Sequence, residues 1–317
     1  MKSSKETWTV SPRDASIRLD QFLVKQMPAE SRSQIQNWIR KGYLRVNGRN
    51  EKTGYRTKTG DLIEAIIPAV IGDLPAAENI PLEILYEDSD LAVINKPAGL
   101  VCHAGAGIRT GTLVNALLFH MGPLDTGDPS RPGIVHRLDK FTSGVMVVAK
   151  TKSAHRKLAR QFKDRSVRKE YLALVYGSMP GDEGTIDEPL GRDPANRKKI
   201  STRARKSRSA VTHYSLEKRY APFSLLRIRL ETGRTHQIRV HLAEKGHPVV
   251  GDILYGGRKH LDLPPRLQSE VKALQRPFLH SRRLEFCQPE TGNPISVEAD
   301  LPGELREFLN RVSACGE

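Results

Sequence analysis

The sequence has few cysteines and no long apolar run, and both features narrow the class of protein. The three cysteines, Cys102, Cys287 and Cys315, are widely separated and odd in number, so neither a disulfide framework nor a zinc site fits their spacing. No apolar run approaches the ~20 residues that a membrane-spanning helix needs, and residues 1–14 lack the apolar centre of a secretory signal. These features predict a reduced, cytoplasmic protein without a membrane partner.

Acidic residues are in the minority. The 317 residues include 51 Lys or Arg against 36 Asp or Glu, which gives a net charge of +15. Such an excess favours a polyanionic partner, and we expect nucleic acid rather than an anionic membrane surface. The sequence also lacks a glycine-rich dinucleotide loop and a cluster of metal-ligating residues, so no cofactor and no metal are expected.

Composition divides the chain into four segments. Residues 1–16 are polar and are predicted to form a loose tail. A compact basic unit is expected at 17–68, and the Gly-, Pro- and Ala-containing stretch 69–80 is predicted to be a linker. Residues 81–317 form the larger domain, and we expect the protein to be a monomer.

Periodicity within these segments predicts α+β architecture. In the basic unit, helices are expected near Arg18–Lys25 and from Ser31, followed by short strands around the turn Asn47-Gly48. In the larger domain, strands alternate between apolar and polar residues, as at 226–231, and a helix capped by Ser153 is expected between strands. Because polar-out strands favour antiparallel pairing, we expect a central, mainly antiparallel mixed sheet with flanking helices.

One candidate site is the charged turn at 133–144, between two apolar, strand-like runs. Asp139 is flanked there by Arg137 and Lys140, and a neighbouring cation favours the ionised carboxylate that a nucleophile needs. Both cations are candidate RNA-binding residues. A purely structural turn, in which Asp139 satisfies backbone donors, is the alternative.

Two further segments carry candidate site residues. Tyr171 starts a strand directly after a basic stretch, where its ring could stack on a base or lie at the edge of the core. Residues 232–242 predict a turn and a helix with Thr235 as N-cap, so that Arg234 and His236 lie at an anion-binding helix terminus. Arg239 could reach a buried carboxylate or remain a surface cation.

Taken in order, these segments resemble the RluA-type family of pseudouridine synthases. The matching residues are HRLDKxTSG at 136–144, with Phe141 at the variable position, KEYxA at 169–173 and TGRTHQIRxHL at 232–242. Residues 17–68 resemble an S4-type RNA-binding domain. The stretch 99–117 is most similar to the branch that acts on large-subunit ribosomal RNA.

The resemblance implies an isomerase that converts specific uridines in RNA to pseudouridine after base flipping. It assigns catalysis to the HRLD aspartate, here Asp139, with Tyr171 packed on the flipped uracil and Arg239 paired with the aspartate. Arg137 would take the place of the displaced base. Phe141 and Ala104 depart from the acidic residue and the proline that are common in the family, which bears on the substrate branch rather than on activity.

A basic segment at 197–208 contains no acidic residue. Its irregular spacing favours a mobile loop that contacts RNA phosphates, with Arg203 and Arg205 as candidate contacts. A solvated loop without a partner is the alternative. For the whole chain, a non-catalytic RNA-binding assembly factor of the ribosome is the main rival function, although such a protein has no need for Asp139, Tyr171 and Arg239 together.

Overall fold

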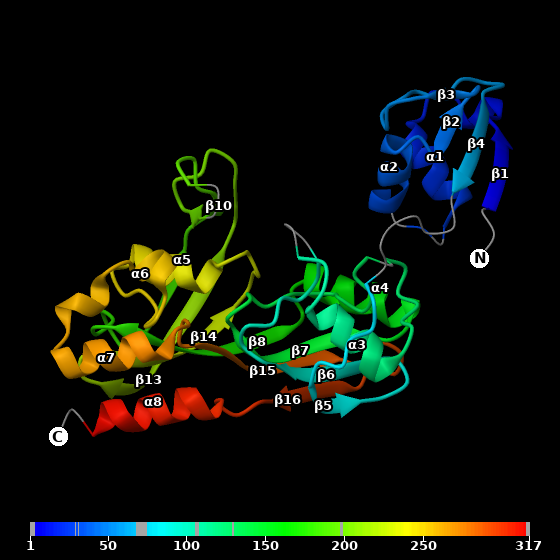
Figure 1. Cartoon of the computed structure of the whole chain (residues 1–317). Helices are drawn as coiled ribbons and strands as arrows, with labels where there is room; N and C mark the ends of the chain where they lie inside the picture. Colours follow the sequence, from blue (N-terminus) through cyan, green and yellow to red (C-terminus); the bar gives the residue numbers. More distant parts are fainter. Residues whose placement is uncertain are drawn as a thin grey trace. The chain divides into compact units, whose positions relative to one another are not determined.

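The computed structural model describes residues 4–314, with the exception of 29, 31, 68–74, 105–107, 129 and 197–198. The chain divides into two units, Met1–Leu74 and Pro75–Glu317, each with a hydrophobic core of its own. In Figure 1 the first unit is blue and the second runs from cyan to red.

The N-terminal unit is a four-stranded antiparallel sheet, of order β1-β4-β2-β3, with two helices whose apolar stripes share its core. In β4, Ile63 and Ala65 are buried whereas Leu62 and Ile66 are exposed, the alternation of a sheet covered on one face. The elements are β1 (Ser4–Thr9), η1 (Pro12–Asp14), α1 (Leu19–Gln26), α2 (Arg32–Arg40), β2 (Leu44–Val46), β3 (Arg49–Asn50) and β4 (Leu62–Ile67).

A buried carboxylate joins the two helices of this unit. Asp20 in α1 is fully buried and accepts hydrogen bonds from Arg32 and Gln36 of α2, at 2.9 and 2.6 Å, and from Arg18. Burial alone would raise the pKa of Asp20, but the hydrogen bonds from Arg18, Gln36 and Arg32 outweigh it and hold the pKa well below its usual value. The unit is therefore fixed by one ionised side chain as well as by its apolar core.

Two of the predicted domain boundaries need correction. The prediction of a loose tail at 1–16 is wrong for Ser4–Thr9, which forms β1 and pairs with β4 along its whole length. The prediction of a linker at 69–80 is wrong for residues 75–80, which lie against α3, where Asn115 donates to the carbonyl of Ala76 at 2.7 Å. Residues 68–74 and the predicted helix start at Ser31 lie outside the described residues.

The larger unit is built on a mixed, mainly antiparallel sheet, as predicted, and this sheet has nine strands. The strand order is β5-β6-β7-β15-β8-β14-β13-β9, with β16 beside β15, and only the β7–β15 pair is parallel among the described strands. The strands are β5 (Glu83–Glu87), β6 (Leu91–Lys96), β7 (Ser143–Ala149), β8 (Arg168–Tyr176), β9 (Glu183–Asp187), β13 (Val211–Tyr220), β14 (Phe223–Leu230), β15 (Leu279–Cys287) and β16 (Pro294–Glu298).

Helices cover both faces of this sheet. In β7, Val145 and Val147 pack in one core cluster with α4, whereas Met146 and Val148 pack in another with α3. Burial on both faces explains why β7 is a continuous apolar run. The helices are α3 (Leu113–Met121), α4 (Lys152–Lys163), α5 (Gln237–Glu244), α6 (Ile253–Gly256), η2 (Lys259–Asp262), α7 (Pro265–Leu274) and α8 (Gly303–Ser313). The N-cap of α4 is Thr151, whose side chain accepts from the amide of Ala154, and not Ser153 as predicted.

Gly144 permits the parallel contact at the start of β7. It pairs with Ser281 of β15 and has a φ of +115°. A Cβ atom at this position would lie 2.1 Å from the carbonyl oxygen of Ser281, a separation that no packing adjustment tolerates. The glycine therefore sets how closely the turn that carries Asp139 approaches the sheet.

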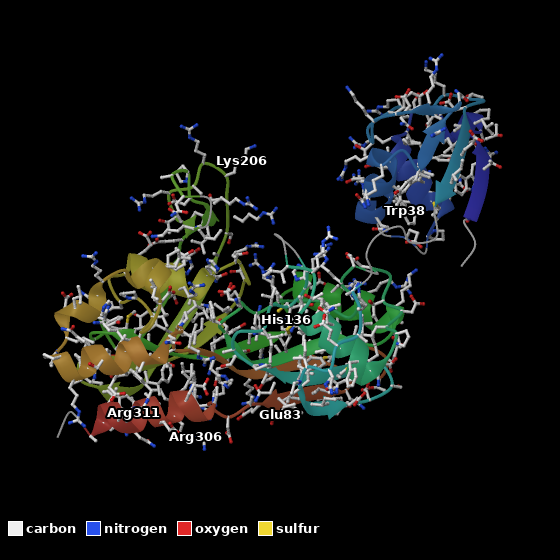
Figure 2. The ribbon with its side chains drawn as sticks, viewed as in Figure 1. Trp38, Glu83, His136, Lys206, Arg306 and Arg311 are labelled. Carbon is white, nitrogen blue, oxygen red and sulfur yellow. The ribbon has the colours of Figure 1, made fainter. Side chains whose placement is uncertain are left out.

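The basic segment is more ordered than predicted. Within it, β11 (Ile200–Ser201) and β12 (Ser207–Arg208) flank β10 (Leu190–Arg192) in a separate three-stranded sheet, so the prediction of an irregular segment is wrong for these four residues, while residues 202–206 form the turn between the two strands. Arg197 and Lys198 lie outside the described residues. Figure 2 shows Lys206 projecting from this small sheet. No helix in the described parts of the chain combines the length and apolar character needed to cross a membrane.

Candidate active site

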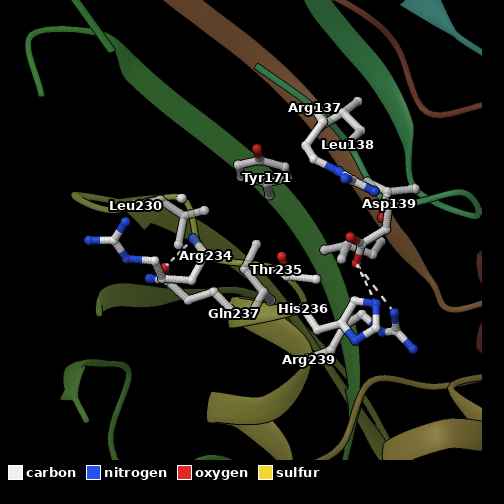
Figure 3. Close-up of a pocket in the computed structure, with 14 residues that line it drawn as sticks. Arg137, Leu138, Asp139, Tyr171, Leu230, Arg234, Thr235, His236, Gln237 and Arg239 are labelled. Carbon is white, nitrogen blue, oxygen red and sulfur yellow. Dashed lines mark hydrogen bonds and ion pairs between the residues drawn. The ribbon is translucent and has the colours of Figure 1, made fainter. Parts of the chain in front are cut away.

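A pocket lies where the turn before β7, strand β8 and the N-terminus of α5 meet (Figure 3). It brings together six of the nine residues that the sequence nominated. They come from the three motifs that the sequence analysis singled out, and they are Arg137, Asp139, Tyr171, Arg234, His236 and Arg239.

The turn that carries Asp139 is anchored on both sides. His136 is stacked on Phe162 of α4, with 4.5 Å between ring centroids, and its Nε2 accepts from the amide of Val147 in β7. Burial lowers the pKa of His136 to about 3, so its ring is a neutral, structural group. On the other side, the buried ammonium of Lys96 donates to the carbonyl of Lys140.

Arg239 joins two carboxylates. Its Nε and Nη2 donate to Asp252 at 2.6 and 2.9 Å, and its Nη1 donates to Oδ2 of Asp139 at 3.3 Å. The predicted contact between Arg239 and Asp139 is therefore present. Burial opposes the charge on Arg239, but the two carboxylates outweigh that effect and raise its pKa. The guanidinium is a permanent cation that holds Asp139 in one position.

His236 approaches the same oxygen of Asp139. Its Nε2 lies 3.9 Å from Oδ2 of Asp139, and its Nδ1 lies 2.8 Å from the hydroxyl of Tyr255. The predicted N-cap, Thr235, is wrong: His236 occupies that position, in a left-handed conformation with φ of +56°, and α5 begins at Gln237. Burial lowers the pKa of His236, which makes the neutral imidazole the dominant form at neutral pH.

Tyr171 forms the wall of the pocket from the middle of the sheet. In β8 it is paired with Ile228 of β14 and with Ser281 of β15, and it is 8% exposed. Burial raises the pKa of Tyr171 to about 12. The side chain therefore presents a neutral ring, fixed by two neighbouring strands, to whatever occupies the pocket.

The remaining nominated residues are less closely tied to the pocket. Arg137 is exposed, and Arg234 is held by a hydrogen bond from its Nε to the carbonyl of Ser209 at 3.1 Å. Lys140 lies outside the pocket lining, with its Nζ 5.1 Å from the centre of the Phe141 ring. The exposed side chains of Arg203 and Arg205, on the three-stranded sheet, are also outside the lining.

The sequence analysis missed two residues that organise the site. Asp252 is buried and binds both Arg239 and the amides of Leu254 and Tyr255. Gln237 accepts from the amide of Arg234 and donates to the carbonyl of Val211, which fixes the turn before α5. No spacing rule in the sequence points to Asp252, because its contact with Arg239 depends on how α6 folds back onto α5.

No group of three His, Cys, Asp or Glu side chains in the described part of the chain is placed to hold a metal ion. The chemistry available in the pocket is that of one carboxylate, the guanidinium cations of Arg137, Arg234 and Arg239, a neutral imidazole and a neutral phenol.

Comparison with known proteins identifies the family. The model for RNA pseudouridylate synthases matches residues 90–244 and the S4 domain model matches residues 17–63. A ribosomal large subunit pseudouridine synthase D from Xanthomonas campestris pv. campestris is 41% identical over 98% of this chain and 94% of its own. The chain belongs to the RNA pseudouridylate synthase family. It is thus an isomerase that acts on RNA, as the three motifs predicted.

Other pseudouridine synthases extend the likeness to the whole chain and to the fold. The RNA pseudouridine synthase YlyB of Bacillus subtilis is 40% identical over 97% of this chain and 98% of its own. The solved structure of human RNA Pseudouridylate Synthase Domain Containing 1 is 28% identical, with a TM-score of 0.56 over 78% of this chain and 90% of that chain. Both the predicted fold and the predicted S4 domain of this pseudouridine synthase are confirmed.

Proposed function

We propose that this pseudouridine synthase isomerises specific uridines of large-subunit ribosomal RNA, with Asp139 as the catalytic carboxylate acting on a flipped-out nucleotide. The observation that carries the proposal is the half-buried carboxylate of Asp139, held by Arg239 in a pocket whose wall is the ring of Tyr171. The names of relatives that are ribosomal large subunit pseudouridine synthases support the choice of RNA.

The reaction rearranges one nucleotide without adding or removing atoms. The bond between N1 of uracil and C1′ of ribose breaks, a bond between C5 and C1′ forms, and the proton lost from C5 is replaced by one gained at N1. Neither a redox partner nor a group donor is required. Asp139 serves as nucleophile or proton acceptor, and the cation of Arg239 stabilises its negative charge during the reaction.

The target base must leave the RNA stack before Asp139 can act. Flipping costs a few kcal/mol of unstacking. Arg137 is exposed beside Asp139, where its guanidinium can fill the space that the base vacates, and Tyr171 offers a ring on which the flipped uracil packs. Once the base fills the pocket, the surrounding side chains keep the detached uracil from water.

The positive charge of the chain supplies affinity for the RNA backbone. The S4 domain and the exposed cations of the three-stranded sheet contact phosphates, while the residues of the pocket recognise the target base. All groups required for the chemistry come from one chain, so we propose a monomer that acts in the cytoplasm without a cofactor.

Pseudouridine mapping in cells tests the proposal. RNA from cells that lack the gene should lose pseudouridine at discrete positions of large-subunit ribosomal RNA, as detected by carbodiimide labelling and reverse transcription. The wild-type gene should restore those positions. An unchanged pseudouridine map, together with a defect in ribosome assembly, would instead support a non-catalytic RNA-binding factor.

A further inference from the structure

Among the described residues, Tyr255 contacts both side chains that form an ion pair with Asp139. It lies in α6, where the N-cap Asp252 accepts a hydrogen bond from its amide at 3.2 Å. Its ring lies 5.1 Å from the guanidinium carbon of Arg239, a cation–π distance, and its hydroxyl lies 2.8 Å from Nδ1 of His236. Arg239 and His236 are the two side chains that approach Oδ2 of Asp139.

The hydroxyl of Tyr255 also binds the three-stranded sheet β10–β12, the basic sheet, through its strand β11. The amide of Ile200 in β11 donates to it at 2.9 Å, and Lys199 lies with its Nζ 5.9 Å from the ring centre. Burial raises the pKa of Tyr255, so the hydroxyl keeps its proton. It accepts one hydrogen bond from Ile200 and has one proton to donate.

Counting protons decides which tautomer of His236 fits. A neutral imidazole carries one N–H. If that proton were on Nδ1, the hydroxyl of Tyr255 would accept twice, and its own proton would have no acceptor among the described residues. If the proton is on Nε2, Tyr255 donates to Nδ1 and the N–H faces the carboxylate of Asp139. Only in the second arrangement is the proton of Tyr255 donated, and the N–H of His236 then points toward the carboxylate at 3.9 Å, an ion-pair distance rather than a hydrogen bond.

We infer that Tyr255 is a positioning residue, which holds His236 as the Nε2–H tautomer facing Asp139 and connects the basic sheet β10–β12 to the catalytic carboxylate. The inference rests on the proposed role of Asp139. Arg239, stacked on the ring of Tyr255, donates the hydrogen bond that orients the carboxylate, and His236 turns its N–H toward the same oxygen from 3.9 Å.

The backbone of His236 is consistent with this role. A left-handed conformation is unfavourable for a residue other than glycine. His236 adopts it at the N-cap of α5 without making a side-chain cap bond. The conformation directs the ring toward Asp139 (Figure 3) and toward the hydroxyl of Tyr255, instead of toward the first amides of the helix.

Tyr255→Phe tests the inference because it keeps the ring over Arg239 and removes only the hydroxyl. We expect kcat for pseudouridine formation to fall about 10- to 100-fold, as for a misplaced catalytic group, with little change in RNA affinity. Tyr214→Phe is the matched control: it removes one hydroxyl hydrogen bond, to the carbonyl of Pro180, away from the pocket.

A second readout needs no RNA. In protein labelled with ¹⁵N-histidine, the signals of His236, assigned by their loss in His236→Gln, should show the Nε2–H tautomer in the wild type and in Tyr214→Phe. Tyr255→Phe should show a mixture of both tautomers. Because this measurement is independent of turnover, it separates a failure of the inference from a failure of the proposed catalytic role of Asp139.

Two results would overturn the inference. One is an unchanged tautomer of His236 in Tyr255→Phe. The other is a loss of RNA affinity with unchanged kcat, which would make Tyr255 an anchor for the basic sheet and nothing more.

Discussion

Arg239 is shared by two carboxylates that come from different parts of the chain. Asp139 is 100 residues away in sequence and Asp252 is 13 away. The planar guanidinium can bind Asp252 with two N–H groups and still reach Asp139 with a third. The sequence predicted the contact with Asp139 through the family motifs. It could not predict that Asp252 forms the two shorter hydrogen bonds with Arg239, because those bonds depend on how α6 folds back onto α5.

Arg239→Lys should therefore impair the enzyme although it keeps the charge. A single ammonium cannot bind Asp252 at two points and also hold Asp139. We expect kcat to fall about 100-fold or more, the cost of losing an oriented charge at a reacting centre, with RNA affinity nearly unchanged. Arg227→Lys, at a half-buried arginine outside the pocket lining that binds Glu217 with two N–H groups, is the control and should retain wild-type kcat. A fully active Arg239→Lys enzyme would show that charge alone is enough.

At the scale of elements, some features were predictable and others were not. The strands of the central sheet and α8 follow from apolar periodicity. β1 was missed because its alternating residues, such as Thr7, Trp8 and Thr9, are mostly polar. The three-stranded sheet was missed because β11 and β12 have only two residues each, and such strands exist only through pairing with β10.

Gly144→Ala tests the junction between β7 and β15. The added methyl would meet the carbonyl of Ser281 in a backbone region that alanine disfavours. We expect the free energy of unfolding to fall by about 3 kcal/mol, from steric overlap and backbone strain together. Gly292→Ala shares the positive φ but meets no atom within 4 Å, so it should cost only about 1 kcal/mol. Denaturant unfolding measures the free energy of unfolding of both variants. Equal decreases in the two would contradict the steric explanation.

Asp20 gives the N-terminal unit a pH-dependent stability. Its folded-state pKa is lowered, so its contribution is present above the ordinary carboxyl pKa and is lost as pH falls toward the folded-state value. Asp20→Asn should lower the stability of this unit by about 2 kcal/mol at pH 7, since charge-assisted hydrogen bonds to a buried group are lost. The difference in stability between wild type and variant, measured by thermal unfolding, should become smaller as the pH falls from 7 to 3. A constant difference would exclude an ionised Asp20.

At the scale of the whole molecule, the motifs determined the family and its fold because they are long and occur in a fixed order. The arrangement of the site required the structure, because His236, Asp252 and Tyr255 act through contacts that sequence spacing does not encode. The positive charge of the chain is divided between the S4 domain and the larger unit, and only the latter carries the pocket.

The basic sheet should contribute affinity and not chemistry. Replacing Arg203, Arg205, Lys206 and Arg208 with Gln should weaken binding to cognate and unrelated RNA alike. The salt dependence of binding should flatten, since each phosphate contact contributes roughly 0.7–0.9 to the log–log slope. The rate at saturating RNA should stay unchanged, because the contact with Tyr255 uses the backbone of Ile200. A lower saturating rate with unchanged affinity would mean that these side chains order the active site.

The most direct measurement is the turnover of Asp139→Asn on large-subunit ribosomal RNA. The substitution keeps the size of the side chain and removes its charge. If Asp139 is the catalytic carboxylate, pseudouridine formation at saturating RNA should be abolished, while RNA affinity and the unfolding transition remain those of the wild type. Turnover within about tenfold of the wild type, equivalent to only about 1.4 kcal/mol of barrier, would contradict the account.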